Sequence, residues 1–133
     1  MDDYLEQILH LIEAKGYARA VDVSKNLGIS QASVTNMLRK LDSEGLVKHE
    51  KYRGTVLTEE GHRIARAIIE RHETLTRFLR LFGVEENTIY RDVEGMEHHV
   101  SRPTLAVIRA IADTLEANPG FLEEARRRID LQA

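Results

Sequence analysis

The sequence predicts a mainly helical protein with one small β-hairpin: an N-terminal winged helix-turn-helix domain followed by a C-terminal all-helical dimerisation domain. Three observations lead to this prediction. Apolar residues recur at helical spacing along most of the chain, glycines separate the helical stretches, and the β-prone runs are confined to residues 46–57. With 133 residues, the chain has room for one or two small domains.

The composition excludes several classes of protein. Hydrophobic residues make up 42% and charged residues 31% of the chain, which is typical of a soluble globular protein and too apolar for a disordered one. The absence of cysteine excludes disulfides and thiolate metal sites. No apolar run is long enough to span a membrane, and a start with two aspartates does not fit a signal peptide. We therefore expect a cytoplasmic protein with no membrane partner.

The first 45 residues predict a helix-turn-helix motif. Apolar residues at positions 5, 8, 9 and 12 indicate a first helix that Gly16 can end, and a short helical segment over 20–27 ends at Gly28. Ser30 is a good N-cap for the next helix, which Gly45 can end. Short hydrogen-bonding groups followed by cations on one face of that helix are typical of a helix that reads DNA. They are Gln31, Ser33, Thr35, Asn36, Arg39 and Lys40.

Residues 46–57 predict a β-hairpin with its turn at Arg53-Gly54. A hairpin directly after a recognition helix is a wing, and Lys51 and Arg53 near its tip would lie over phosphates or the minor groove of double-stranded DNA. The net charge of the chain is −3, yet seven basic residues outnumber four acidic ones between Arg19 and Arg53. This local excess suits phosphate contact, although a solvated face of mixed charge would have the same composition.

Beyond the wing, the pattern is helical throughout. Thr58 is the expected N-cap of a long helix over about 58–82 that bridges two domains, which we place at 1–70 and 71–133. Helices are expected over 85–100 and 102–117, with a short last helix after Pro119-Gly120. Several apolar residues of the 102–117 helix need covering, so we expect a homodimer that presents two recognition helices to a palindromic site. These residues are Leu105, Ile108, Ile111, Ala112 and Leu115.

Six residues form a candidate metal site: Asp3, Glu6, His72, Glu94, Glu97 and His98. Residues three and four apart share a helix face, so the first two converge on one point and the last three on another. Carboxylates with a little imidazole suit a divalent ion such as manganese or iron better than a soft ion. Each group also has an ordinary alternative. The N-terminal acids can complement the helix dipole, the second acidic group can be solvated, and His72 can be a satisfied core residue.

Four motifs carry a resemblance to a known family. They are Asp3-x-x-Glu6, the wing sequence Glu50-Lys51-Tyr52-Arg53-Gly54-x-Val56-Leu57-Thr58, Arg71-His72-Glu73, and Asp92-Val93-Glu94-Gly95-Met96-Glu97-His98-His99. Together with the helix-turn-helix they resemble the diphtheria toxin repressor family, in its manganese-regulator branch. The chain stops where iron-type relatives continue into an SH3-like third domain, so it resembles the two-domain members.

The resemblance implies a Mn(II)-responsive transcriptional repressor that binds a palindromic operator as a homodimer when metal-loaded and controls manganese uptake genes. It also implies that the six candidate residues bind two Mn(II) ions per subunit between the domains, with Glu6 and Glu97 bridging the ions. Iron-type relatives have Met in place of Asp3 and Cys in place of Glu94, so two hard carboxylates favour Mn(II) here. Fe, Co, Cd and Zn are alternative occupants.

Two other functions compete with this interpretation. A dinuclear carboxylate–histidine centre can activate water for hydrolysis, but no spare acid or base stands out and the helix-turn-helix would be idle. A winged-helix regulator that senses a small molecule, or nothing, would leave the acidic residues as plain surface. The four motifs favour the metal-dependent repressor, and we expect no enzymatic activity.

Overall fold

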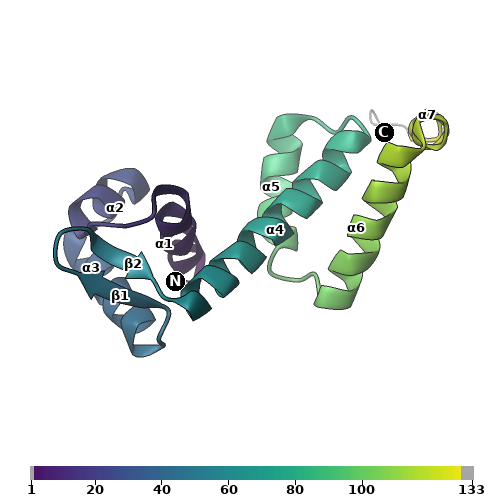
Figure 1. Ribbon diagram of the computed structural model, residues 1–133. Helices are drawn as coiled ribbons and strands as arrows, with labels where there is room; N and C mark the ends of the chain where they lie inside the picture. The colour runs from purple at the N-terminus through teal and green to yellow at the C-terminus, as the bar shows by residue number, and fades with distance from the viewer. Residues whose placement is uncertain (1, 130–133) are drawn as a thin grey trace. The chain divides into compact units, whose positions relative to one another are not determined.

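The computed structural model describes residues 2–129, with side chains from residue 4 onward. The chain forms two compact units, Met1–Ile69 and Glu70–Ala133. Helices dominate both units, and the described residues form a single two-stranded antiparallel sheet (Figure 1). The predicted fold class is therefore confirmed. None of the helices between residues 2 and 129 combines the length and the apolar character that a bilayer crossing requires.

The first unit contains the predicted helix-turn-helix. Its helices are α1 (Asp2–Lys15), α2 (Ala20–Leu27) and α3 (Gln31–Ser43). Gly28, at a φ of 67°, ends α2, and its N–H donates to the Ser24 carbonyl at 3.0 Å. Ser30 caps α3, because its Oγ accepts from the Ser33 N–H at 3.1 Å. These two caps define the short turn that joins α2 to α3.

The hairpin consists of β1 (Val47–Glu50) and β2 (Gly54–Leu57). Glu50 lies opposite Gly54, so the loop contains three residues, 51–53. The turn predicted at Arg53-Gly54 was therefore placed one residue too late. Gly54 begins β2 with a φ of 88°, which L side chains rarely adopt.

A third segment of backbone pairs with the hairpin. Ala18 and Thr55 exchange two hydrogen bonds, each 2.7 Å long. A Cβ atom on Gly54 would lie only 2.6 Å from the Ala18 carbonyl oxygen. Glycine is thus needed at this position both for its backbone conformation and for the close approach of the chain before α2.

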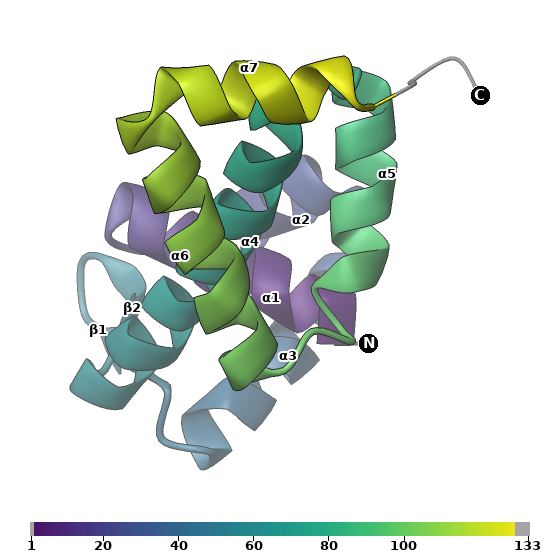
Figure 2. The ribbon, with the colours of Figure 1, turned by 90° about the vertical axis from the view of Figure 1, so that its right-hand side faces the viewer.

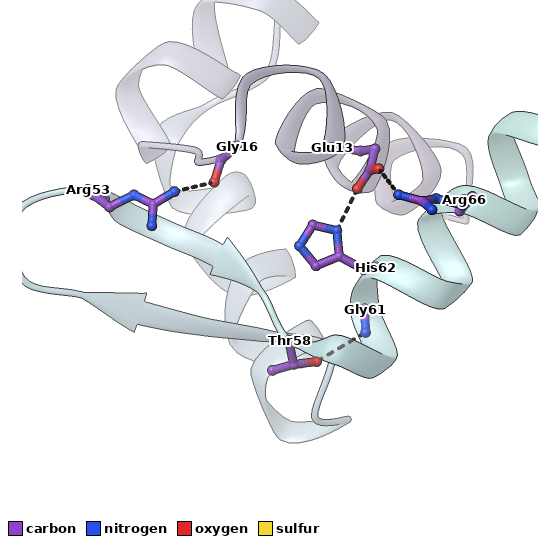
Figure 3. Close-up of polar contacts among 7 residues, drawn as sticks. All are labelled: Glu13, Gly16, Arg53, Thr58, Gly61, His62 and Arg66. Atoms are coloured by element: carbon purple, nitrogen blue, oxygen red, sulfur yellow. Dashed lines mark hydrogen bonds and ion pairs between the residues drawn. The ribbon is translucent and has the colours of Figure 1, made fainter.

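The core of the first unit joins all of its elements. Buried side chains come from α1, α2, α3 and the hairpin, and the first turns of α4 (Glu59–Leu81) complete it with Ala65. Thr58 caps α4 as predicted, because its Oγ1 accepts from the Gly61 N–H at 3.0 Å (Figure 3). The same hydroxyl donates to the Gly45 carbonyl at 2.6 Å. Gly61 packs so tightly that an added Cβ would lie 1.9 Å from the Leu46 carbonyl oxygen. The backbone directly before β1 therefore lies against the backbone of α4.

The second unit contains the C-terminal part of α4 with α5 (Glu86–Met96), α6 (Arg102–Ala117) and α7 (Pro119–Arg127). Leu75 of α4, Ile89 and Val93 of α5 and Leu105 of α6 form its buried core. In Figure 2, α7 runs crosswise at the end of α6. All regular elements among the described residues of this unit are helices, as the sequence predicted.

Two expectations for this unit need correction. The helix expected over 85–100 ends at Met96 and continues as a turn. The Arg71 guanidinium donates to the carbonyls of Glu97 (3.4 Å) and Val100, which holds these groups outside a continuing helix. Among the apolar residues of α6 said to need covering, Leu105 and Ala112 are already buried within the chain.

Candidate nucleic-acid interface and metal-binding residues

Helix α3 presents the predicted recognition face to solvent. Val34, Met37 and Leu41 are buried in the core of the first unit, so the opposite side of the helix is free. Ser33 also serves the helix cap, since its N–H and hydroxyl both contact the Ser30 Oγ. The predicted residues of this face divide into two exposure classes. Ser33 and Thr35 are half-buried, and the exposed ones are Gln31, Asn36, Arg39 and Lys40.

The two predicted basic residues of the wing differ in their contacts. The Lys51 ammonium lies 5.5 Å from the centre of the exposed Tyr52 ring. The Arg53 guanidinium turns back to the protein, donating to a Glu50 carboxylate oxygen and to the Gly16 carbonyl, both at 3.3 Å (Figure 3 shows the contact with Gly16). The charge of Arg53 is thus partly compensated within the first unit.

Arg19 also belongs to this surface, although the sequence analysis included it only in the count of basic residues. Its Nη2 donates to the Tyr52 carbonyl at 3.1 Å, and its guanidinium lies 5.8 Å from the centre of the Tyr17 ring. The contact with Tyr52 joins residues 33 positions apart. No local pattern marks such a contact, so sequence reasoning had no signal for it.

A groove of about 400 Å³ separates α3 from the hairpin. Thr35 and Arg39 line one side, and Lys48 and Thr55 line the other. Arg19 also lines the groove, so three cations and one acid, Asp42, border a largely apolar floor. The recognition helix and the wing therefore flank one positively charged depression, which is the arrangement that a nucleic-acid backbone requires.

Two of the six candidate metal ligands meet in the second unit. The His72 Nδ1 on α4 contacts the Glu97 Oε1 just beyond α5. Glu97 is still bonded as the next helical residue, because its N–H donates to the Val93 carbonyl at 2.9 Å. Its side chain is only 12% exposed, so this carboxylate is largely withdrawn from solvent. The pair offers one carboxylate oxygen and one imidazole nitrogen to a shared point.

The other four candidates are placed less closely. Glu94 on α5 and His98 in the following turn are exposed, and Glu6 on α1 is half-buried. The Asp3 side chain lies outside the described residues, although its backbone forms part of α1. Among side chains from residue 4 to 129, no three histidine or acidic groups gather closely enough to hold a metal ion.

The donor types present nevertheless fit a hard or borderline divalent ion. Carboxylate oxygen and imidazole nitrogen are ligands that Mn(II) and Fe(II) accept, and the chain has no thiolate to attract a soft ion. Arg71, one residue before His72, holds the turn that carries Glu97 and His98 through its bonds to the carbonyls of Glu97 and Val100. Two adjacent residues of α4 thus fix the position of Glu97: Arg71 through its carbonyl and His72 through its carboxylate.

Glu13 ties α1 to α4 within the first unit (Figure 3). Its carboxylate lies 2.7 Å from the His62 Nδ1 and accepts a 3.4 Å bond from the Arg66 Nη2. The hydrogen bond with His62 lowers the pKa of Glu13 below its usual 4.5, against an opposing effect of burial and with added help from Arg66. This contact fixes α1, the helix that carries Asp3 and Glu6, against the start of α4.

Comparisons with known proteins identify the same two regions. Residues 1–55 match the model "Iron dependent repressor, N-terminal DNA binding domain", and residues 58–123 match "Iron dependent repressor, metal binding and dimerisation domain". The chain is 47% identical to the HTH-type transcriptional regulator MntR of Geobacillus kaustophilus, over 98% of this chain and 87% of that protein. It is 46% identical to MntR of Bacillus subtilis, over 100% of this chain and 89% of the relative.

A solved structure gives the same fold. The structure of the manganese regulator SloR superposes with a TM-score of 0.67 at 26% identity, covering 84% of this chain and 52% of that one. The chain thus spans about half the length of this solved relative. Taken with the two matched domains and the similarity to MntR over nearly the whole chain, these findings show that the chain belongs to the iron-dependent repressor family.

Proposed function

We propose that the chain is a manganese-responsive transcriptional repressor that binds operator DNA as a homodimer when metal is bound and controls manganese uptake genes. The observation that carries this proposal is the 46–47% identity to regulators named MntR across nearly the whole chain. The protein acts as a DNA-binding regulator in the cytoplasm, where its operator lies, and not as an enzyme. The exposed face of α3 and the cationic groove beside the wing support DNA binding.

The metal ligands in this proposal are the six residues predicted from the sequence. The contact between His72 and Glu97 supports the proposal, because it brings together two of these donors from separate helical segments. The ion is Mn(II), with two ions per subunit, and Fe, Co, Cd and Zn are alternatives. Bound metal supplies the positive charge that offsets the repulsion among the carboxylates. The full set is Asp3, Glu6, His72, Glu94, Glu97 and His98.

The placement of these ligands along the chain suggests how metal affects DNA binding. Asp3 and Glu6 lie on α1, whose unit also carries the recognition helix, and the other four lie on α4, α5 and the turn after it. Shared ligation would restrict the two units to one arrangement in each subunit. In a homodimer on a palindromic operator, such restriction favours the state in which two recognition helices match successive major grooves, about 34 Å apart.

Exposed apolar side chains on α6 support the homodimer. Val107 is 57% and Ile111 is 43% exposed, and the two lie four residues apart on one face of the helix. A second copy would remove this surface from water. The residues that need covering are therefore these two, rather than the buried Leu105 and Ala112.

A fluorescence anisotropy titration of a palindromic operator tests the proposal. We expect Mn(II) to raise the affinity of the wild-type protein by about 100-fold, a normal coupling for an allosteric regulator, with weaker effects of Fe(II), Co(II) and Zn(II). The Glu97→Gln variant should lose this response and remain a folded dimer. Asp92→Asn is the matched control, because Asp92 is an exposed acid on the other side of α5.

Two results would overturn the proposal. Wild-type protein that binds the operator equally well with Mn(II) and with EDTA would exclude metal control. A full Mn(II) response in Glu97→Gln would exclude Glu97 from the ligand set, even if metal control itself were retained.

A further inference from the structure

We propose that Tyr52 is the side chain through which the wing contacts operator DNA, and that Arg19 and Arg53 are positioning residues that hold it there. This inference rests on the proposed DNA-binding function. It revises the role predicted for Arg53 from its charge, which was direct contact with phosphates or the minor groove. It also gives a role to Tyr52, a residue that charge and spacing did not single out.

Tyr52 has the exposure expected of a contact residue. It occupies the centre of the three-residue loop between β1 and β2, and it is 81% exposed, more than any other large hydrophobic side chain among the described residues. The Lys51 ammonium lies over its ring at 5.5 Å. The loop therefore presents a flat aromatic surface and a cation side by side, a combination that suits a deoxyribose and its adjacent phosphate.

The backbone beneath Tyr52 is fixed at three points. The Arg19 Nη2 donates to the Tyr52 carbonyl at 3.1 Å. The Arg53 guanidinium reaches in the other direction, to the Gly16 carbonyl and the Glu50 carboxylate at 3.3 Å each. The paired backbone of Ala18 and Thr55 completes the attachment. Two of the three attachments use guanidinium groups that turn towards the protein. The main role of these two cations is therefore to hold the loop in place.

The surroundings of the loop identify DNA as its partner. The hairpin and α3 border the same groove, whose lining includes three cations, Arg19, Arg39 and Lys48, against one acid, Asp42. From Arg19 to Arg53 basic residues exceed acidic ones by seven to four, although the chain as a whole is negative. With α3 in the major groove, a strand of DNA backbone would lie along this cationic groove. The wing on the far side of that strand would then face the adjacent minor groove.

This arrangement assigns different chemistry to neighbouring residues. The Tyr52 ring packs against the sugar wall of the minor groove, and its hydroxyl donates to a phosphate or base-edge oxygen. Lys51 neutralises a phosphate. Arg53 contributes affinity only through the position of Tyr52, so Arg53→Ala should hardly change the number of counterions released when the protein binds DNA.

Salt-dependent operator affinities separate these roles. Log affinity falls as log salt rises, and each lost phosphate contact makes this slope less steep by about 0.9. Lys51→Ala should make the slope less steep by this amount. Tyr52→Ala should reduce affinity about tenfold with the slope unchanged, and Tyr52→Phe should retain most of the affinity. Arg53→Ala should behave like Tyr52→Ala, and Arg53→Lys should fail to rescue it, because one ammonium cannot hold both the Glu50 carboxylate and the Gly16 carbonyl.

A double-mutant cycle provides the decisive readout for the positioning role. If Arg53 acts through Tyr52, the Tyr52→Ala/Arg53→Ala protein binds no more weakly than Tyr52→Ala alone. A merely structural role for Arg53 would give additive losses. Circular dichroism and Mn(II) affinity should match the wild type in every variant, which controls for folding.

Three outcomes would overturn the inference: unchanged affinity in Tyr52→Ala, additive losses in the cycle, or rescue by Arg53→Lys with a slope less steep by about 0.9 in Arg53→Ala. Failure of the proposed function is a distinct result, because wild-type protein would then show no Mn(II)-dependent operator binding.

Discussion

At the scale of single residues, Glu13 offers a measurable stability effect. Its pKa is lowered in the folded protein, chiefly by the hydrogen bond with His62, so ionised Glu13 stabilises the fold. This contribution is fully present above pH 4.5, the usual pKa, and is lost as the pH falls through the lower folded value. We predict that Glu13→Gln lowers the free energy of unfolding at pH 7 by about 0.5–1 kcal/mol, the size of a partly exposed ion pair.

Urea unfolding at pH 7 and at pH 3 would measure this effect. The difference between wild type and Glu13→Gln should be smaller at pH 3, because below pH 4.5 the unfolded chain takes up a proton at Glu13 and the stabilisation by its lowered pKa declines. Glu60→Gln is the control, since Glu60 pairs only along α4 with Arg63 on the protein surface. Equal destabilisation by the two variants at pH 7 would contradict a tertiary role for Glu13.

Residue types and spacing predicted some of the site and none of its long-range contacts. His72 was one of the candidate ligands, with a core histidine as the alternative, and the structure brings it to Glu97, 25 residues away. The fold also turns Arg53 towards Gly16 and Arg19 towards Tyr52, across 37 and 33 residues. Those contacts depend on the path of the backbone before α2, which a local pattern does not specify.

At the scale of secondary-structure elements, helix boundaries set by neighbouring residues were predicted, and one boundary that depends on a distant residue was not. Ser30 and Thr58 accept the expected N–H bonds, because an N-cap depends on one side chain and the residues directly after it. The end of α5 at Met96 depends instead on Arg71, a residue of another helix. The turn of the hairpin was likewise missed by one residue, since its position depends on the register of β1 against β2, in which Glu50 lies opposite Gly54.

The contact between the hairpin and α4 leads to a second prediction. An added Cβ at Gly61 would lie 1.9 Å from the Leu46 carbonyl oxygen, so the backbone would have to move. We expect Gly61→Ala to lower the free energy of unfolding by about 2 kcal/mol or more, because overpacking typically costs about 1–3 kcal/mol and here the clash is with backbone. Thermal unfolding followed by circular dichroism would measure the loss.

Gly95 provides the matched control for this prediction. It lies inside α5 with no atom within 4 Å of an added Cβ, so Gly95→Ala should stabilise the helix by about 0.5–1 kcal/mol. If both substitutions had the same sign of effect, helix propensity rather than the close backbone approach would explain Gly61.

At the scale of the whole molecule, charge is divided between regions with different partners. The stretch from Arg19 to Arg53 is basic, and the complete chain carries −3. The acidic excess therefore lies elsewhere, and it includes the four carboxylates proposed as metal ligands. In the proposed function, one partner is a polyanion and the other a cation, so both can be bound by one small chain without competing for the same surface.

Thermodynamic linkage between these two partners gives a final prediction. If Mn(II) raises operator affinity about 100-fold, the coupling free energy is about 2.7 kcal/mol, and the operator must raise Mn(II) affinity by the same factor. Competition with a fluorescent metal indicator would measure Mn(II) binding to the free protein and to its operator complex. A scrambled duplex of the same length controls for nonspecific electrostatic attraction. Since reciprocity is obligatory, unchanged Mn(II) affinity on the operator would mean that metal and DNA are uncoupled at equilibrium, and the proposed mechanism would be wrong.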